Sequence, residues 1–134
     1  MHIIACIDDR DGMLFNRRRV SSDRMLIQKI CDLCAAGKLW MNSYSAKLFD
    51  ERPEKMAVSD DFLHLAGRDD YCFVETADLL PFFESIKSVT LCCWNRKYPA
   101  DTYFPRALLQ GKQPVFTEEF PGNSHEKVTL VRYE

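Results

Sequence analysis

Short runs of apolar residues recur along the chain and predict a fold built mainly on strands. Ile3–Ile7 is a continuous apolar run that ends at charged residues, which is typical of a buried strand. Near the C-terminus, Pro114–Phe120 and Lys127–Tyr133 have the pattern of a closing antiparallel pair, and the second segment alternates apolar and polar positions. Further strands are predicted over Lys38–Asn42, Phe62–Ala66, Tyr71–Glu75 and Ser88–Trp94.

The apolar positions change to helical spacing after Ser21 and Ser22. The two serine hydroxyls are able to cap the first backbone N–H groups of a helix, and Gly37 is a natural end for it. Asp23 lies in the first turn, where a carboxylate suits the positive end of the helix dipole. The apolar face of this predicted helix consists of Leu26, Ile30, Leu33 and Cys34.

The remaining segments are predicted as short helices and loops. Ser45–Phe49 and Ala77–Ser85 are expected to be helical, with Pro81 in the first turn of the second. Asn16–Val20 and Asp50–Asp61 are polar or charged and are expected to be mostly loop. Strands that alternate with helices before a C-terminal hairpin predict an α/β fold whose central sheet is mixed but mostly parallel.

Length and charge fit a small globular domain and disfavour several classes of partner. The chain has 134 residues, 46% of them hydrophobic, and a formal net charge of −2. These values predict a single domain with one core, and no overall field that would attract nucleic acid or an acidic membrane. The first apolar run leads directly into acidic residues and lacks the features of a signal peptide, so we expect a cytoplasmic protein.

Six cysteines are interpreted as core residues. Thiols stay reduced in the cytosol, and a free cysteine packs like a small hydrophobic side chain. A zinc site that combines Cys31 and Cys34 with Cys92 and Cys93 is disfavoured, because adjacent residues of a strand point to opposite faces. We therefore expect no metal.

Asp101–Pro105 reads Asp-Thr-Tyr-Phe-Pro and resembles the Asp-Thr-His/Tyr-Phe-Pro motif of dihydrofolate reductases. Ile3–Ile7, the loop Asp11–Leu14 and the two C-terminal strands are similar to the corresponding parts of that family. The resemblance implies a single-domain, three-layer dihydrofolate reductase-like fold over residues 1–134, with a central mixed sheet and an antiparallel C-terminal hairpin. Residues 47–70 are short for the family's adenosine-binding region.

In dihydrofolate reductases a carboxylate of the first helix anchors the pterin ring, and Asp23 is the nearest candidate here. A carboxylate that heads an apolar helix face is expected to have a raised pKa and to handle a proton. Two alternatives stay open: Asp23 is only a solvated helix-start residue, or Met25 occupies the family's position. The implied substrate pocket is lined by Ala5, Cys6, Ile27, Val74, Cys92 and Asp101.

The segments that hold the cofactor phosphates in this family differ here. Asn42–Ser45 replaces the family's Gly-Arg-x-Thr, and Glu75–Asp78 replaces its glycine-rich turn. Glycine lets the backbone approach a dinucleotide closely. A carboxylate about 4 Å from a phosphate charge costs about 4 kcal/mol at an effective dielectric of about 20. We therefore expect a degenerate cofactor site and no bound cofactor.

These observations favour a diverged dihydrofolate reductase-like protein that has lost NADPH binding and reductase activity and serves as a small-molecule-binding or interaction domain. The alternative is an active NADPH-dependent reductase of a pterin such as dihydrofolate, or of a flavin-pathway substrate. In that alternative Asp23 holds and protonates the substrate, and Arg17, Arg18 and Arg19 contact phosphate; otherwise the arginines are a solvated patch. A homodimer that covers the altered cofactor face is a third alternative.

Overall fold

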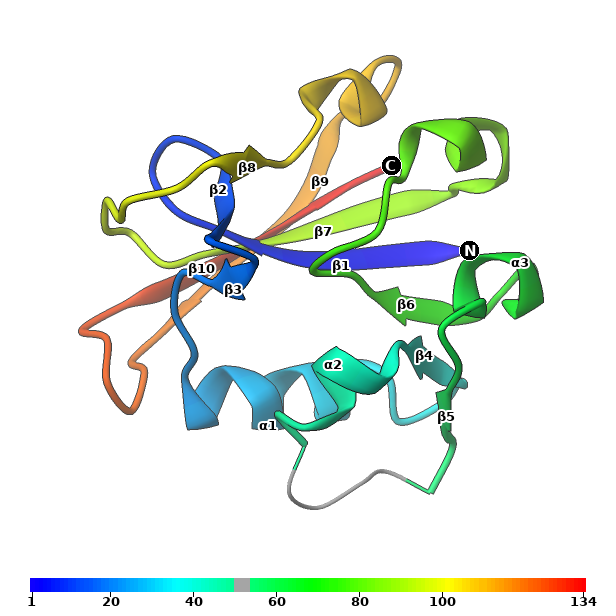
Figure 1. Ribbon diagram of the computed structural model, residues 1–134, viewed down its shortest axis with the longest axis horizontal. Coiled ribbons are helices and arrows are strands. Elements are labelled where there is room, and N and C mark those ends of the chain that lie inside the picture. The colour runs from blue at the N-terminus through cyan, green and yellow to red at the C-terminus, as the bar shows by residue number, and fades with distance from the viewer. Residues whose placement is uncertain (50–53) are drawn as a thin grey trace.

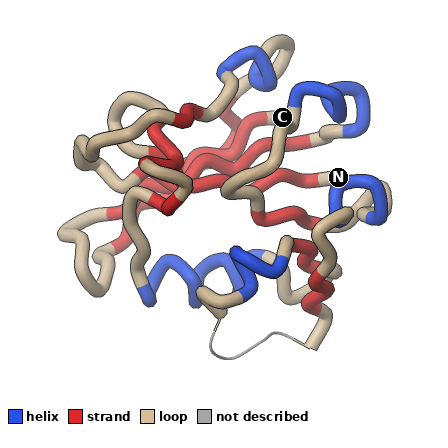
Figure 2. The backbone as a smooth tube through the Cα atoms, viewed as in Figure 1, coloured by secondary structure: helices blue, strands red, loops and turns tan. Residues whose placement is uncertain are grey.

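The computed structural model describes residues 1–49 and 54–134, whose strands form two sheets (Figures 1 and 2). The main sheet has the order β5 (Met56–Val58), β4 (Leu39–Met41), β6 (Tyr71–Phe73), β1 (His2–Ile7), β7 (Ser88–Cys93), β10 (Val128–Tyr133) and β9 (Pro114–Phe120). The strands from β5 to β7 are parallel, and β10 is antiparallel to both β7 and β9. The predicted α/β fold with a mixed, mostly parallel sheet is confirmed.

Helices and a second sheet cover the two faces of the main sheet. The helices α1 (Arg24–Leu33) and α2 (Ser43–Ala46) lie below it in the view of Figure 1. The small sheet has the order β3 (Arg18–Arg19), β2 (Gly12–Phe15) and β8 (Thr102–Tyr103), and β2 and β8 lie above β1 and β7 in this view. The other short helices are α3 (Phe62–Leu65) and the 3-10 helices η1 (Leu80–Ser85) and η2 (Arg106–Leu109). Among the described residues, no helix is long and apolar enough to cross a membrane.

Strand β1 shows how side chains alternate between two apolar cores. Ile4 belongs to the core under α1, together with Leu26. Ile3 and Ala5 belong to the opposite core, together with Leu14 of the small sheet. Because successive side chains of a strand point to opposite faces, a continuous apolar run such as β1 serves both cores.

The predicted strand over Phe62–Ala66 is wrong, because this segment forms the helix α3. The N–H of Ala66 donates to the carbonyl of Phe62, as in a helical turn. A short apolar run does not distinguish a strand from a helix by its pattern alone. Of the loop predicted over Asp50–Asp61, residues 50–53 lie outside the described residues, and Met56–Val58 forms β5.

Two other predicted helices are shifted or tightened. The helix α2 begins at Ser43, before the predicted start, because the Asn42 side chain accepts the N–H of Ser45 and so caps the helix there. The helix predicted over Ala77–Ser85 is reduced to η1, with Pro81 in its first turn as expected.

The segment Asn16–Val20, predicted as loop, contains β3 and a tight turn. Asn16 and Arg17 have φ angles of 49° and 64°, in the left-handed region that side chains disfavour. These residues connect the antiparallel strands β2 and β3. Since successive strand residues point to opposite faces, the turn directs Arg18 and Arg19 in opposite directions.

Candidate functional site

Asp23 caps the start of α1. Its backbone is extended, with φ −153° and ψ 129°, and its side chain accepts the N–H groups of Met25 and Leu26 at 2.9 and 3.3 Å. These donors have no partner within a helix, so the carboxylate stabilises the first turn. The cap is therefore Asp23 rather than the preceding serines.

The same carboxylate holds the loop that connects β9 to β10. It accepts the N–H groups of Asn123 and Ser124 at 3.0 and 2.9 Å, and it lies 2.9 Å from Nδ1 of His125. Gly122 allows this approach, because a Cβ at that position would lie 2.6 Å from Oδ2 of Asp23. Asp23 therefore joins residues about a hundred positions apart in the sequence.

These contacts decide the charge of Asp23, which is only 3% exposed. Burial raises the pKa of the Asp23 carboxyl, but hydrogen bonds from the Asn123 N–H, the His125 ring and the Ser124 N–H outweigh burial and hold the pKa well below its usual range. The prediction of a raised pKa is wrong, since it assumed burial without these donors. Asp23 starts the helix, as one alternative held, but it is buried and not solvated, and Met25 is exposed.

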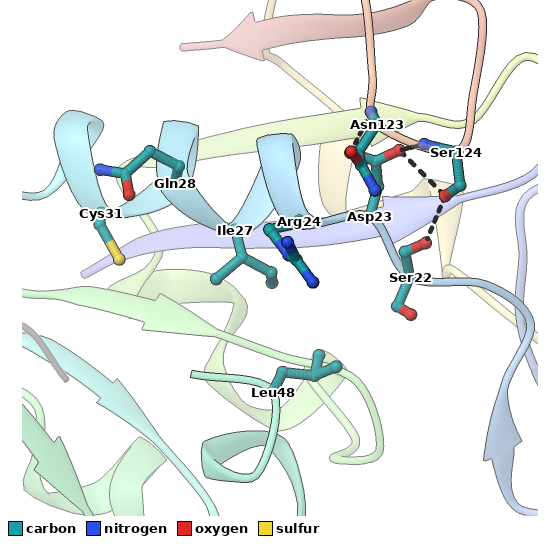
Figure 3. Close-up of a pocket in the computed structure, with 9 residues that line it drawn as sticks. All are labelled: Ser22, Asp23, Arg24, Ile27, Gln28, Cys31, Leu48, Asn123 and Ser124. Carbon is teal, nitrogen blue, oxygen red and sulfur yellow. Dashed lines mark hydrogen bonds between the residues drawn. The ribbon is translucent and has the colours of Figure 1, made fainter. Parts of the chain in front are cut away.

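A cavity of about 550 Å³ lies between α1, Leu48 and the β9–β10 loop (Figure 3). Asp23 and Ile27 line it, as predicted for a substrate pocket. Its other lining residues are five polar or charged side chains, one thiol and one leucine: Ser22, Arg24, Gln28, Asn123, Ser124, Cys31 and Leu48. The cavity suits a small molecule with both apolar and hydrogen-bonding groups.

The structure does not bring the other predicted pocket residues to this cavity. Ala5 and Val74 are fully buried in the core on the opposite face of the main sheet. Cys6 and Cys92 do face α1, but they lie opposite each other in the register of β1 and β7 and pack, as free thiols, in the core beneath the helix. Asp101 is exposed and accepts the N–H of Asn16 at 3.0 Å. Strand alternation separates residues that the family resemblance grouped together.

A second buried carboxylate, Glu75, follows β6. Arg19 of β3 donates to it twice, from Nε at 2.8 Å and from a terminal nitrogen at 3.0 Å. Ser45 of α2 donates its hydroxyl to the same carboxylate at 2.8 Å. Beside it, the Asn42 side chain donates to the Thr76 hydroxyl at 2.8 Å. The cost expected for a phosphate beside Glu75 is that of an unpaired carboxylate, whereas a bidentate guanidinium neutralises this one.

The three consecutive arginines therefore have different surroundings. Arg19 is bound to Glu75, and its guanidinium also lies 4.4 Å from the centre of the Tyr44 ring. Arg18 is exposed and lines a separate cavity of about 500 Å³, together with Val20 and Tyr98. Arg17 is exposed in the turn. Of the three predicted phosphate contacts, Arg18 is the one that both lines a cavity and has no recorded carboxylate partner among the described residues.

His125 is the functional candidate that the sequence did not reveal. Its ring is stacked on Trp94 at 4.6 Å between centroids, and its Nε2 lies 3.0 Å from both the Ser21 and the Tyr98 hydroxyl. Its partner Asp23 is 102 positions away, so no local spacing could have paired them. The result is a buried chain of carboxylate, imidazole and hydroxyl groups beside two cavities.

Comparison with known proteins supports the fold without assigning an activity. No family model matches the chain, and no curated protein matches it by sequence. Its structure is similar to that of dihydrofolate reductase from Enterococcus faecalis complexed with NADP(H) and RAB-propyl, with a TM-score of 0.68 over 99% of this chain and 94% of that chain. The identity is 8%, so the similarity is one of fold. The chain has a dihydrofolate reductase-like fold.

Proposed function

We propose that the protein binds a small molecule in the cavity beside α1 and does not use NADPH as a reductant. One observation carries the second part. The segments Asn42–Ser45 and Glu75–Asp78 correspond by resemblance to those that hold the cofactor phosphates in dihydrofolate reductases. They are hydrogen-bonded to each other, Asn42 to Thr76 and Ser45 to Glu75. Two side-chain donors of these segments, the Asn42 amide and the Ser45 hydroxyl, are therefore used within the chain and not available to a phosphate.

The buried ion pair adds to this obstacle. Burial lowers the pKa of Arg19, but the hydrogen bonds and charge of Glu75 outweigh burial, so the guanidinium stays charged. A phosphate that replaced Glu75 as the partner of Arg19 would leave the buried carboxylate without its counter-charge and with the Ser45 hydroxyl as its recorded donor. Losing such partners costs about 1–3 kcal/mol, which is about a five- to a hundredfold loss of affinity.

The cavity side also lacks a proton donor at Asp23. Reduction of a pterin ring requires a proton as well as a hydride, and a carboxyl supplies a proton only when its pKa lies near the working pH. The pKa of Asp23 lies well below its usual range, because backbone and ring N–H donors outweigh the effect of burial. This direction supports ligand binding rather than reduction.

Titration with NADPH tests the loss of cofactor binding. Trp94 and Trp40 are the two fluorophores, and binding is followed by their quenching and, in parallel, by thermal unfolding. We expect no saturable quenching and no rise in melting temperature at micromolar NADPH. Saturable micromolar binding in either measurement would contradict the proposal and favour an active reductase.

A native thiol tests the cavity. Cys31 lines the cavity, and burial together with the neighbouring Asp32 raises the pKa of this thiol. Its alkylation is therefore slow, and a ligand that covers the thiol should slow it further. Folates, flavins and nucleotides are screened by thermal unfolding, because a ligand at a hundred times its Kd stabilises by about 2.7 kcal/mol. We expect a stabilising ligand to slow alkylation of Cys31 but not of half-buried Cys93. Stabilisation without protection of Cys31 would place the ligand elsewhere.

A further inference from the structure

The imidazole of His125 has one nitrogen that its structural role does not use. Asp23 is ionised and accepts from Nδ1, so the proton of the neutral ring lies on Nδ1 and Nε2 carries a lone pair. That lone pair faces the hydroxyls of Ser21 and Tyr98, each at 3.0 Å. Trp94 stacks on the ring, which is 4% exposed, and fixes its orientation.

This arrangement contains the three parts of an activated nucleophile. A hydroxyl lies within hydrogen-bonding distance of a base, and a carboxylate orients that base from its other side. Ser21 is the better nucleophile of the two hydroxyls, because an alkoxide concentrates the charge that a phenolate ring spreads. Ser21 is half-buried, so it is more accessible than the ring behind it.

We propose that Ser21 is a nucleophile activated by His125, with Asp23 as the positioning residue, and that these residues hydrolyse carboxylic esters that carry an anionic group. The substrate class follows from the adjoining cavity of about 500 Å³. Val20, the residue before Ser21, and Tyr98, which contacts the same ring nitrogen, both line that cavity. Arg18 lines it too and supplies a cation for the anionic group, since Arg19 is bound to Glu75.

The reaction has two balanced steps. First, Oγ of Ser21 bonds to the ester carbonyl carbon and its proton passes to Nε2 of His125; the bond to the leaving alcohol then breaks, and the alcohol takes that proton. Second, water gives a proton to Nε2 and its hydroxyl to the acyl carbon; the bond to Ser21 breaks, Ser21 regains the proton, and the carboxylic acid leaves. Only one hydroxyl proton can point at Nε2 at a time, so Tyr98 can donate to the developing oxyanion.

An alkyl fluorophosphonate tests the nucleophile directly. Attack forms a bond between Ser21 Oγ and phosphorus and expels fluoride, and mass spectrometry of the peptides locates the adduct. We expect labelling at Ser21, complete loss in Ser21→Ala, and an unchanged rate in the control Ser85→Ala, at an exposed serine of η1 that lines neither cavity. Absence of labelling in the wild-type chain, or labelling at Tyr98 or elsewhere instead, overturns the proposal.

The role of the His125 ring as the base is tested by the rates of labelling and of ester hydrolysis. We expect His125→Gln to slow both labelling and hydrolysis of p-nitrophenyl esters at least a hundredfold. Asp23→Asn keeps a residue able to cap α1 but no longer fixes the tautomer, so the same loss is expected. The wild-type rate should rise with pH and then level off, as for a reaction that depends on one unprotonated base. Undiminished labelling of Ser21 in either folded variant overturns the assignment of the base.

The pH profile separates positioning from mere stability. The titratable groups recorded against the ring are Asp23 from the start of α1 and Tyr98 from the loop after β7. The residue that directly follows β7, Trp94, is uncharged. Removing the Asp23 charge should lower the midpoint of the profile, because a neighbouring anion stabilises the protonated form of a base. A midpoint that does not move in Asp23→Asn contradicts the positioning role.

Matched arginine variants test the substrate class. The ratio of kcat/KM for p-nitrophenyl hemisuccinate to that for p-nitrophenyl acetate measures preference for an anion. We expect Arg18→Gln to reduce this ratio about fivefold, as for one exposed ion pair. Arg17→Gln removes the same charge from a residue that does not line the cavity, and it should leave the ratio nearly unchanged. Equal effects of both variants overturn the role of the cavity.

Discussion

Asp23 and Glu75 are both buried carboxylates at the carboxyl edge of the parallel strands, but different partners balance them. Backbone N–H groups and an imidazole surround Asp23, and they belong to α1 and the β9–β10 loop. A guanidinium from β3 and a hydroxyl from α2 surround Glu75. This edge is where open α/β sheets bind ligands, so the two clusters show how differently one edge can be used.

The two clusters differ in whether the partners of the carboxylate keep hydrogen-bonding groups that the carboxylate does not use. The donors recorded around Glu75 all end on the protein itself, and the cluster closes the space between β6 and α2. At Asp23, the partner His125 still presents a second nitrogen to two hydroxyls, next to cavities on either side. The Glu75 cluster therefore stabilises the fold, whereas the Asp23 cluster also has a ring nitrogen that can take part in a reaction.

Removing Asp23 should have the largest effect. Asp23→Ala deletes the cap of α1 and leaves His125 and two loop N–H groups without their acceptor. We expect a loss of about 3–5 kcal/mol in the free energy of unfolding, measured with urea, as for breaking one side of a buried pair. Asp32→Asn, at an exposed site of the same helix, is the control and should stay within about 0.5 kcal/mol of wild type. A loss below about 1 kcal/mol at Asp23 would show that the two clusters do not differ as described.

Removing the charge of Glu75 should have a smaller effect. Glu75→Gln keeps the shape of the side chain but leaves Arg19 without a counter-charge, and Arg19 is 22% exposed and so partly solvated. We expect a loss of about 1–3 kcal/mol in the same urea measurement. The double variant Arg19→Met, Glu75→Leu should lose less than the sum of the two single replacements, because no charge is left unpaired. Additive losses would contradict a compensated ion pair.

The sequence predicts the strands of this fold better than its charged clusters. The apolar runs that became β1 and β7 are recognisable because each strand buries most of its side chains, and β10 is recognisable by the alternation of buried and less buried positions at its start. The short run that became α3 fails, since Leu65 is exposed and only its first two residues are buried.

The clusters depend on pairings that no local pattern specifies. Arg19, and not Arg18, reaches Glu75 because a turn with two residues at positive φ sets the direction of β3. His125 reaches Asp23 because Gly122 leaves room for the carboxylate. The sequence identified Asp23 and the arginines as chemically interesting, but it could not show which partners neutralise them.

Lowering the pH should reduce the stabilisation that Asp23 provides, and this change in the free energy of unfolding should be smaller and more gradual than those caused by the two substitutions above. Hydrogen bonds outweigh burial and depress the folded-state pKa of Asp23, so its contribution is fully present above the unfolded value of about 3.9 and is lost as pH falls toward the folded pKa. The free-energy difference between wild type and Asp23→Asn, from urea unfolding at pH 5, 4 and 3, should therefore shrink below about pH 4, by at most about 1.4 kcal/mol per pH unit. The pKa of Asp8 is also lowered, because the N–H groups of Tyr98, Gly12 and Arg10 outweigh burial there. Wild type and Asp23→Asn both contain Asp8, so its contribution cancels when the two free energies of unfolding are subtracted. A difference that is constant from pH 5 to pH 3 would mean that neutral donors do not hold Asp23 in its ionised form, and the contrast with the ion-paired Glu75 would fail.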